Sequence, residues 1–135
     1  MKSRYTFPAI FHFADDGISV EYPDLPGCLS CADTEDEAFN NAKEVLQLHL
    51  YGMEQDKDII PEPSKIKDIS IEENETIVLI EVFMPAFRDK MANKAVNKMV
   101  TLPRWLNELA DQEKVNCSQI FQNALKAYLD VEKRP

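Results

Sequence analysis

Hydrophobic and polar residues alternate in the first part of the chain. The apolar positions of the first alternating segment are Tyr5, Phe7, Ala9, Phe11 and Phe13. A period of two predicts a strand with one buried face, and Pro8 within it predicts an open edge or a bulge, because proline has no N–H to donate. Asp16 and Gly17 predict a tight turn into a second strand, and residues 28–32 are apolar enough for a short third strand.

A spacing of three and four residues replaces this alternation after Thr34. The shared apolar face consists of Ala38, Ala42, Val45, Leu46, His49 and Met53. This spacing predicts a helix, and Thr34 with Glu37 has the spacing of a capping box at its start. Residues 55–75 are polar, contain two prolines and predict a connection. Residues 76–84 are apolar at both odd and even positions, which predicts a strand buried within the sheet.

The order strand, strand, strand, helix, strand predicts a small α+β domain over residues 1–84. A linker of mixed charge follows at residues 85–94. Residues 95–131 then contain one strand-like run and two amphipathic helices, the first starting at Pro103 and the second capped by Asn116. Such a unit of about 35 residues is smaller than the roughly 40 that an independent core requires, and a lone strand leaves its N–H and C=O groups unpaired. The sequence therefore predicts that two copies pair strand to strand.

The net charge of −9 conceals a division along the chain. Residues 1–89 hold 7 Lys and Arg against 19 Asp and Glu, a net charge of −12, whereas residues 90–135 hold 8 against 5, a net charge of +3. An acidic body attracts a basic protein and repels phosphate, and a basic segment does the reverse. The division predicts two partners of opposite electrostatic character.

The three cysteines predict neither a disulfide framework nor a metal site. No apolar run approaches the roughly 18 residues of a membrane span, and the first residues reach charge and proline too early for a signal peptide. We therefore expect a cytoplasmic protein with reduced thiols.

Cys28 and Cys31 have metal-ligand spacing, but strand residues three apart point to opposite faces and no second pair is present. Buried free thiols, with no metal or cofactor, are the expectation.

The C-terminal part resembles a ribbon-helix-helix DNA-binding domain in residues 96–103, 104–110 and 116–125. The resemblance implies a dimer whose paired strands enter the major groove, where Asn97 reads adenine and Thr101 meets a base or a thymine methyl group. The expected DNA contacts are Asn97, Met99, Thr101, Lys94, Lys98, Arg104, Cys117 and Ser118, the last two through the N–H groups that open a helix. The expected dimer core comprises Val96, Val100, Leu102, Leu106, Leu109, Ile120, Phe121, Ala124 and Leu125.

The N-terminal part resembles the HicB antitoxin family. The matching segments are residues 5–13, 16–17, 22–28 with the sequence YPDLPGC, 33–38 and 60–64. The resemblance implies a partial ribonuclease-H-like fold, a partner toxin of the HicA type, which is a small basic RNA-cleaving protein, and repression of the operon that encodes both. The expected toxin contacts are Asp15, Asp16, Glu21, Asp24, Leu25 and Pro26.

Two other functions compete with this interpretation. Asp15, Asp16, Glu21 and Asp24 are candidate magnesium ligands of a ribonuclease-H-like nuclease, which would require at least three carboxylates to converge. A repressor that binds a small ligand and has no toxin is the third possibility. We expect an inhibitor and autorepressor and not an enzyme.

Overall fold

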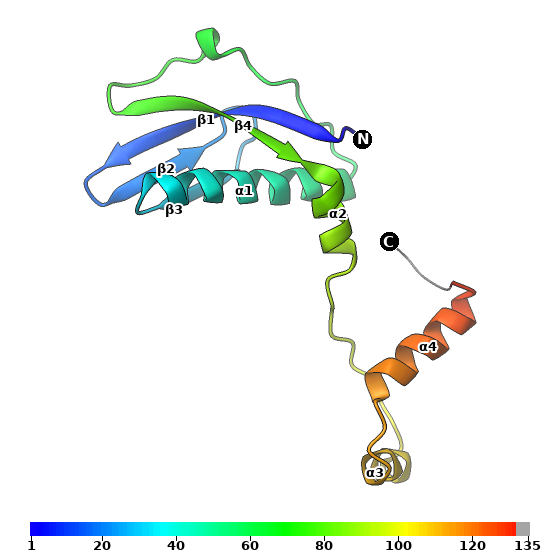
Figure 1. The fold of residues 1–135 in the computed structure, drawn as a ribbon. Coiled ribbons are helices and arrows are strands. Elements are labelled where there is room, and N and C mark those ends of the chain that lie inside the picture. The colour runs from blue at the N-terminus through cyan, green and yellow to red at the C-terminus, as the bar shows by residue number, and fades with distance from the viewer. Residues whose placement is uncertain (132–135) are drawn as a thin grey trace. The chain divides into compact units, whose positions relative to one another are not determined.

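An antiparallel sheet of four strands forms the centre of the first of two units. The structure, a computed structural model, describes residues 1–131 and divides into Met1–Met91 and the residues from Ala92 onward. The strands are β1 (Arg4–Ala14), β2 (Gly17–Glu21), β3 (Leu29–Ala32) and β4 (Glu75–Phe83), in the order β3-β2-β1-β4. Helix α1 (Glu35–Gln55) follows β3, and the predicted order of strands and helix is confirmed (Figure 1).

Helix α1 covers one face of the sheet and encloses the core with it. The buried residues on the facing surfaces are Phe7, Ala9, Phe11, Val20, Ile80 and Val82 of the strands and Ala38, Ala42, Leu46 and Leu50 of α1. The predicted capping box is present, because the Glu37 N–H donates to Thr34 Oγ1 at 3.2 Å and the Glu37 carboxylate accepts from the Asp33 N–H at 3.3 Å. His49 is half-buried beside this core.

The opposite face of the sheet is partly covered as well. Pro8 and Ile10 of β1 are buried although they point away from α1, and the connection over residues 56–74, with a short 3-10 helix η1 (Ile66–Asp68), passes on that side (Figure 1). β2 pairs with β1 only from Ile10 onward, whereas Pro8 is paired with Leu79 of β4 alone. The open edge predicted at Pro8 is therefore confirmed.

Strand β4 lies at an edge of the sheet, so its predicted burial within the sheet is wrong. Ile80 and Val82 face the core, but Leu79 and Phe83 are exposed on the other face. A strand with apolar residues on both faces resembles a central one in sequence, but the pattern carries no information on which neighbours it pairs with.

The segment predicted as a linker, residues 85–94, is helical for most of its length. Helix α2 (Met84–Ala92) follows β4 directly, and Pro85 suits its first turn because the N–H it lacks has no partner there. Arg88 of α2 donates two hydrogen bonds to Glu54 of α1, at 3.0 and 2.7 Å, and Phe87 packs edge-on against Tyr51. These contacts attach α2 to the first unit, which therefore extends beyond the predicted boundary at residue 84.

The second unit contains two helices, α3 (Arg104–Gln112) and α4 (Cys117–Leu129). Pro103 occupies the N-cap position of α3, one residue before the helix begins. The predicted cap of α4 is confirmed, because Asn116 Oδ1 accepts a hydrogen bond from the Gln119 N–H at 3.0 Å. The run at residues 96–102 is not a strand in this single chain, where it has no partner strand with which to form a ladder. None of the described helices combines the length and hydrophobicity needed to cross a bilayer.

Candidate functional site

The predicted acidic residues of the β1–β2 turn lie at the tip of the hairpin. Asp15 and Asp16 are exposed and form the turn between the two strands. Gly17 follows with a φ of 145°, and a Cβ at this position would lie 2.9 Å from the carbonyl oxygen of Ala32. Glycine is therefore required where β3 approaches the turn, and the turn presents its two carboxylates to solvent.

The loop over residues 22–28 is held to the core at several points. The Tyr22 hydroxyl donates to the carbonyl oxygen of Ala42 at 2.6 Å, and burial raises the pKa of Tyr22 well above its usual range. Successive turns form through hydrogen bonds from the Leu25 N–H to Tyr22 and from the Cys28 N–H to Leu25, both at 3.0 Å. Leu25 is buried and belongs to the core. Its prediction as a toxin contact is wrong, because its side chain fills the space beneath the loop.

Asp24 of this loop has a partner that the sequence does not reveal. Its carboxylate accepts hydrogen bonds from the N–H of Ser64, at 2.9 Å, and from the Ser64 hydroxyl. These bonds fasten the connection between α1 and β4 to the 22–28 loop. Asp24 is half-buried, while Glu21 and Pro26 on either side of it are exposed.

The carboxylates considered as magnesium ligands do not converge. Asp15 and Asp16 precede β2, and Asp24 follows it and binds Ser64. Across residues 1–131, no three His, Cys, Asp or Glu side chains gather in an arrangement suited to a metal ion. The nuclease alternative thus lacks a ligand set in the described chain.

The two cysteines with metal-ligand spacing lie on opposite sides, as predicted. Cys28 is buried, its thiol lies 3.7 Å from the carbonyl oxygen of Val45, and burial raises its pKa to about 11. Cys31 is exposed, as is Cys117. The expectation of buried thiols for this pair is correct for Cys28 and wrong for Cys31.

A groove that the sequence analysis missed lies beside the 22–28 loop. It has a volume of about 650 Å³ and is bordered by Asp24 and Pro26, the C-terminal half of α1 and the first residues after that helix. Its lining includes Leu48, Asp56, Asp58 and Ile59. We call it the acidic groove. A signal was present in the sequence, because the last turn of α1 contains no basic residue and two of the next three residues, Asp56 and Asp58, are acidic.

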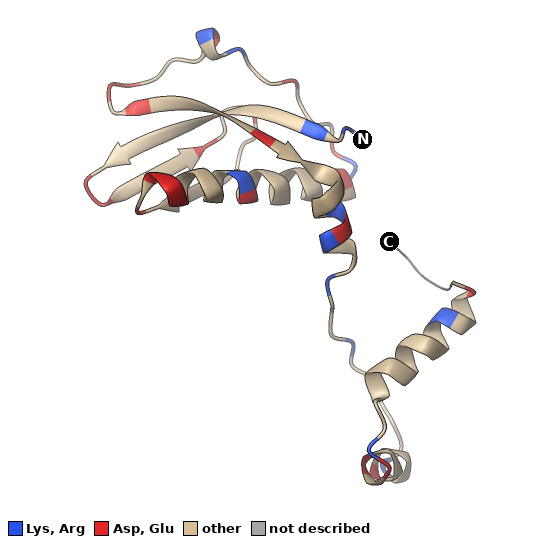
Figure 2. Ribbon diagram, viewed as in Figure 1, with Lys and Arg blue, Asp and Glu red and all other residues tan. Residues whose placement is uncertain are grey.

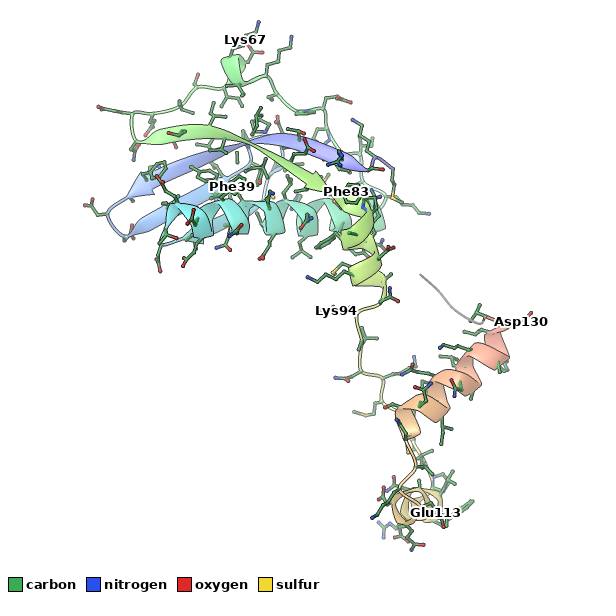
Figure 3. All side chains as sticks on the ribbon, in the orientation of Figure 1. Phe39, Lys67, Phe83, Lys94, Glu113 and Asp130 are labelled. Atoms are coloured by element: carbon green, nitrogen blue, oxygen red, sulfur yellow. The ribbon has the colours of Figure 1, made fainter. Side chains whose placement is uncertain are left out.

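The predicted DNA contacts are all at the surface of the second unit. The exposed residues are Asn97, Met99, Thr101, Lys94, Lys98, Arg104, Cys117 and Ser118. Lys94 lies on the segment between α2 and α3 (Figure 3). Cys117 and Ser118 are the first residues of α4, where backbone N–H groups lack partners within the helix.

The predicted dimer core is exposed in the single chain. Val96 and Val100 retain 86% and 54% of their accessible surface, and the other members are exposed too: Leu102, Leu106, Leu109, Ile120, Phe121, Ala124 and Leu125. No side chain among the described residues from 92 to 131 is buried. Two amphipathic helices are thus present without a core between them.

Comparison with known proteins identifies a family that matches most of the chain. The family described as the HicB-like antitoxin of bacterial toxin-antitoxin systems matches residues 7–125. An uncharacterised 14.9 kDa protein from the rep-hol intergenic region of Haemophilus phage HP1 is 32% identical over 106 residues, which cover 78% of this chain and 79% of that protein.

Solved structures share the fold. A chain of a toxin-antitoxin complex from Streptococcus pneumoniae superposes with a TM-score of 0.61 and 19% identity, covering 93% of this chain and 99% of that one. The antitoxin HicB of Burkholderia pseudomallei gives a TM-score of 0.53 and 20% identity, covering 91% and 98%. With a family match over most of its length, the chain belongs to the HicB-like antitoxins of bacterial toxin-antitoxin systems.

Proposed function

We propose that this protein binds and inhibits a HicA-like toxin, a small basic protein that cleaves mRNA, and represses the operon that encodes both. The observation that carries the proposal is the division of the chain into an acidic unit with its own core and a second unit in which no side chain from residue 92 to residue 131 is buried. The acidic unit suits a basic protein as its partner, and the second unit requires another copy of itself to cover its apolar side chains. Both activities belong to the cytoplasm, and neither requires the chain to be an enzyme.

The acidic unit is the toxin-binding part of the proposal. Asp and Glu outnumber Lys and Arg across its strands and α1 (Figure 2). Opposed charge accelerates encounter and excludes partners of like charge, so an excess of carboxylates favours a basic partner over nucleic acid. The proposed contacts are Asp15, Asp16, Glu21, Asp24 and Pro26, all of which are at least partly accessible.

The second unit is the dimerisation part. An amphipathic helix is stable in water when its apolar face is covered, and the apolar faces of α3 and α4 are uncovered within the described chain. Pairing of residues 96–102 with the same residues of another copy would form the missing ladder and bring four helices together. This arrangement accounts for Val100 and Leu106 as core positions.

The paired strands are the DNA-reading part. A two-fold ribbon presents the same side chains to each half of a palindromic site. Asn97 offers an amide that pairs with adenine, and Thr101 offers a hydroxyl and a methyl group. Lys94, Lys98 and Arg104 provide the positive charge that binds phosphates.

A mobility-shift series with the full chain and its own promoter tests the DNA-reading part. Asn97→Ala should lose about 1–3 kcal/mol of discrimination at one base pair in each half-site. Lys94→Ala should weaken binding to all sequences equally and lower the salt dependence by about one counterion. If both variants match the wild type on specific and on random DNA, the ribbon does not read DNA as proposed.

A further inference from the structure

The acidic groove has an apolar surface that the fold leaves uncovered. Ile59 retains 91% of its accessible surface and Leu48 of α1 retains 55%, although both line the same groove with Met53. Ile59 is more exposed than any other large apolar residue of Met1–Met91. A branched aliphatic side chain held at the surface beside two further apolar ones is typical of an interaction site.

The lining of the groove carries negative charge, and the one neighbouring cation in the sequence, Lys57 between Asp56 and Asp58, is not part of that lining. Asp24, Asp56 and Asp58 line the groove, and none of its described lining residues is Lys or Arg. The Asp24 carboxylate is occupied by Ser64. By contrast, none of the ion pairs formed within the described chain involves Asp56 or Asp58. These two carboxylates are the ones available to a partner.

The end of α1 holds the two aspartates in fixed positions. The Asp58 N–H donates to the Met53 carbonyl at 2.8 Å, and the Lys57 N–H donates to the Glu54 carbonyl at 3.2 Å. This is the Schellman arrangement, with Asp56 as the helix cap and Lys57 in the left-handed conformation at a φ of 59°. The backbone of the rim is therefore ordered before any partner binds.

This charge arrangement is unfavourable for the isolated chain. A helix C-terminus carries a partial negative charge and is stabilised by nearby cations, yet the last turn of α1 contains no basic residue. Asp56 and Asp58 add negative charge where positive charge would stabilise the helix, and Lys57 between them offsets only one of the two carboxylates. Departures of this kind from the rules of stability are expected at functional positions.

From the open apolar surface and the unpaired acidic rim, we propose that the acidic groove binds a lysine or arginine side chain of the toxin. The aliphatic part of that side chain packs against Leu48 and Ile59, and its charged end lies between Asp56 and Asp58. Long basic side chains combine apolar stems and charged ends in this way. The inference rests on the proposed function and assigns it to one place on the acidic unit.

Full-length variants with matched controls test this assignment by calorimetric titration with the purified toxin. Asp56→Asn with Asp58→Asn should weaken binding at least about tenfold at low salt, and by less at high salt, because charge pairs are screened. Glu72→Gln with Glu73→Gln removes the same charge from exposed residues outside the groove lining and should change affinity less than twofold. Ile59→Ser should weaken binding, and Ile71→Ser in the same connection should not.

Thermal unfolding separates lost contacts from lost structure. The Asp56→Asn and Asp58→Asn pair should unfold at the same or a higher temperature than the wild type, because it relieves the unfavourable charge at the end of α1. Groove variants that bind the toxin as the wild type does overturn the inference while the proposed function stands. Groove variants that lose self-association and keep toxin affinity show that a second copy occupies the groove, which also overturns it. A wild-type protein that does not bind the toxin overturns the proposed function and this inference with it.

Discussion

Replacing Arg88 with methionine should destabilise the first unit by about 3 kcal/mol. Arg88 donates to both oxygens of Glu54 at 3.0 and 2.7 Å and to the carbonyl oxygen of Lys2 at 2.6 Å. The Glu54 side chain is only 3% exposed and that of Arg88 is 20% exposed. Removing one member of a buried pair leaves the other charge without compensation and costs roughly 3–5 kcal/mol. The partial exposure of Arg88 places the expected loss at the lower end.

The chain provides a matched control for this substitution. Arg4 pairs with Glu81 at 3.0 Å, but both side chains are more than half exposed, so Arg4→Met should cost less than about 1 kcal/mol. Urea unfolding followed by far-ultraviolet circular dichroism measures both, because the single tryptophan, Trp105, lies in the second unit. Adding Glu54→Gln to Arg88→Met should restore part of the loss. Equal losses for the two arginine variants, or no restoration by Glu54→Gln, would refute the reasoning.

Three further predictions concern the thiols, the end of α1 and the dimer. Burial raises the pKa of Cys28 to about 11, so the thiol ionises at a lower pH in the unfolded chain than in the folded one. The free energy of unfolding should therefore fall by on the order of 2 kcal/mol between about pH 8.5 and pH 11. Urea unfolding repeated across that range measures the fall, which should be smaller in Cys28→Ala. Lys57→Gly should raise the free energy of unfolding by about 0.5–1 kcal/mol, because glycine adopts a positive φ without the steric cost, and the urea midpoint would show it. Val100→Asp should abolish the proposed dimer and sediment as a monomer, because an isolated carboxylate is costly to bury; a dimeric variant would contradict the placement of the strand.

Local patterns in the sequence were sufficient for the order of strands and helix from β1 to β4. The alternation around Phe7 and the spacing around Leu46 each reflect a nearby buried surface, and the caps at Thr34 and Asn116 depend on residues three apart. Such features depend on residues that lie close together in the sequence, and a local pattern therefore predicts them.

Features that depend on distant residues were missed. The edge position of β4 depends on strand order, and α2 is held by a contact between Arg88 and Glu54, 34 residues apart. The bond between Asp24 and Ser64 joins residues 40 apart, so Asp24 was interpreted as a toxin contact or a magnesium ligand and not as an anchor of the connection after α1. The acidic groove forms where the 22–28 loop meets the C-terminal half of α1 and the residues after it, and Asp56 and Asp58 were its only indication in the sequence.

The proposed function is tested most directly by titrating the full chain into an RNA-cleavage assay of a HicA-like toxin, the small basic partner that the proposal assigns to it. If the chain inhibits this toxin, RNA cleavage should stop once the concentration of toxin-binding sites on the chain equals the concentration of toxin. Inhibition should weaken as the salt concentration rises, because opposed charge guides the encounter. Cleavage that continues in the presence of a saturating excess of folded chain would contradict the proposal.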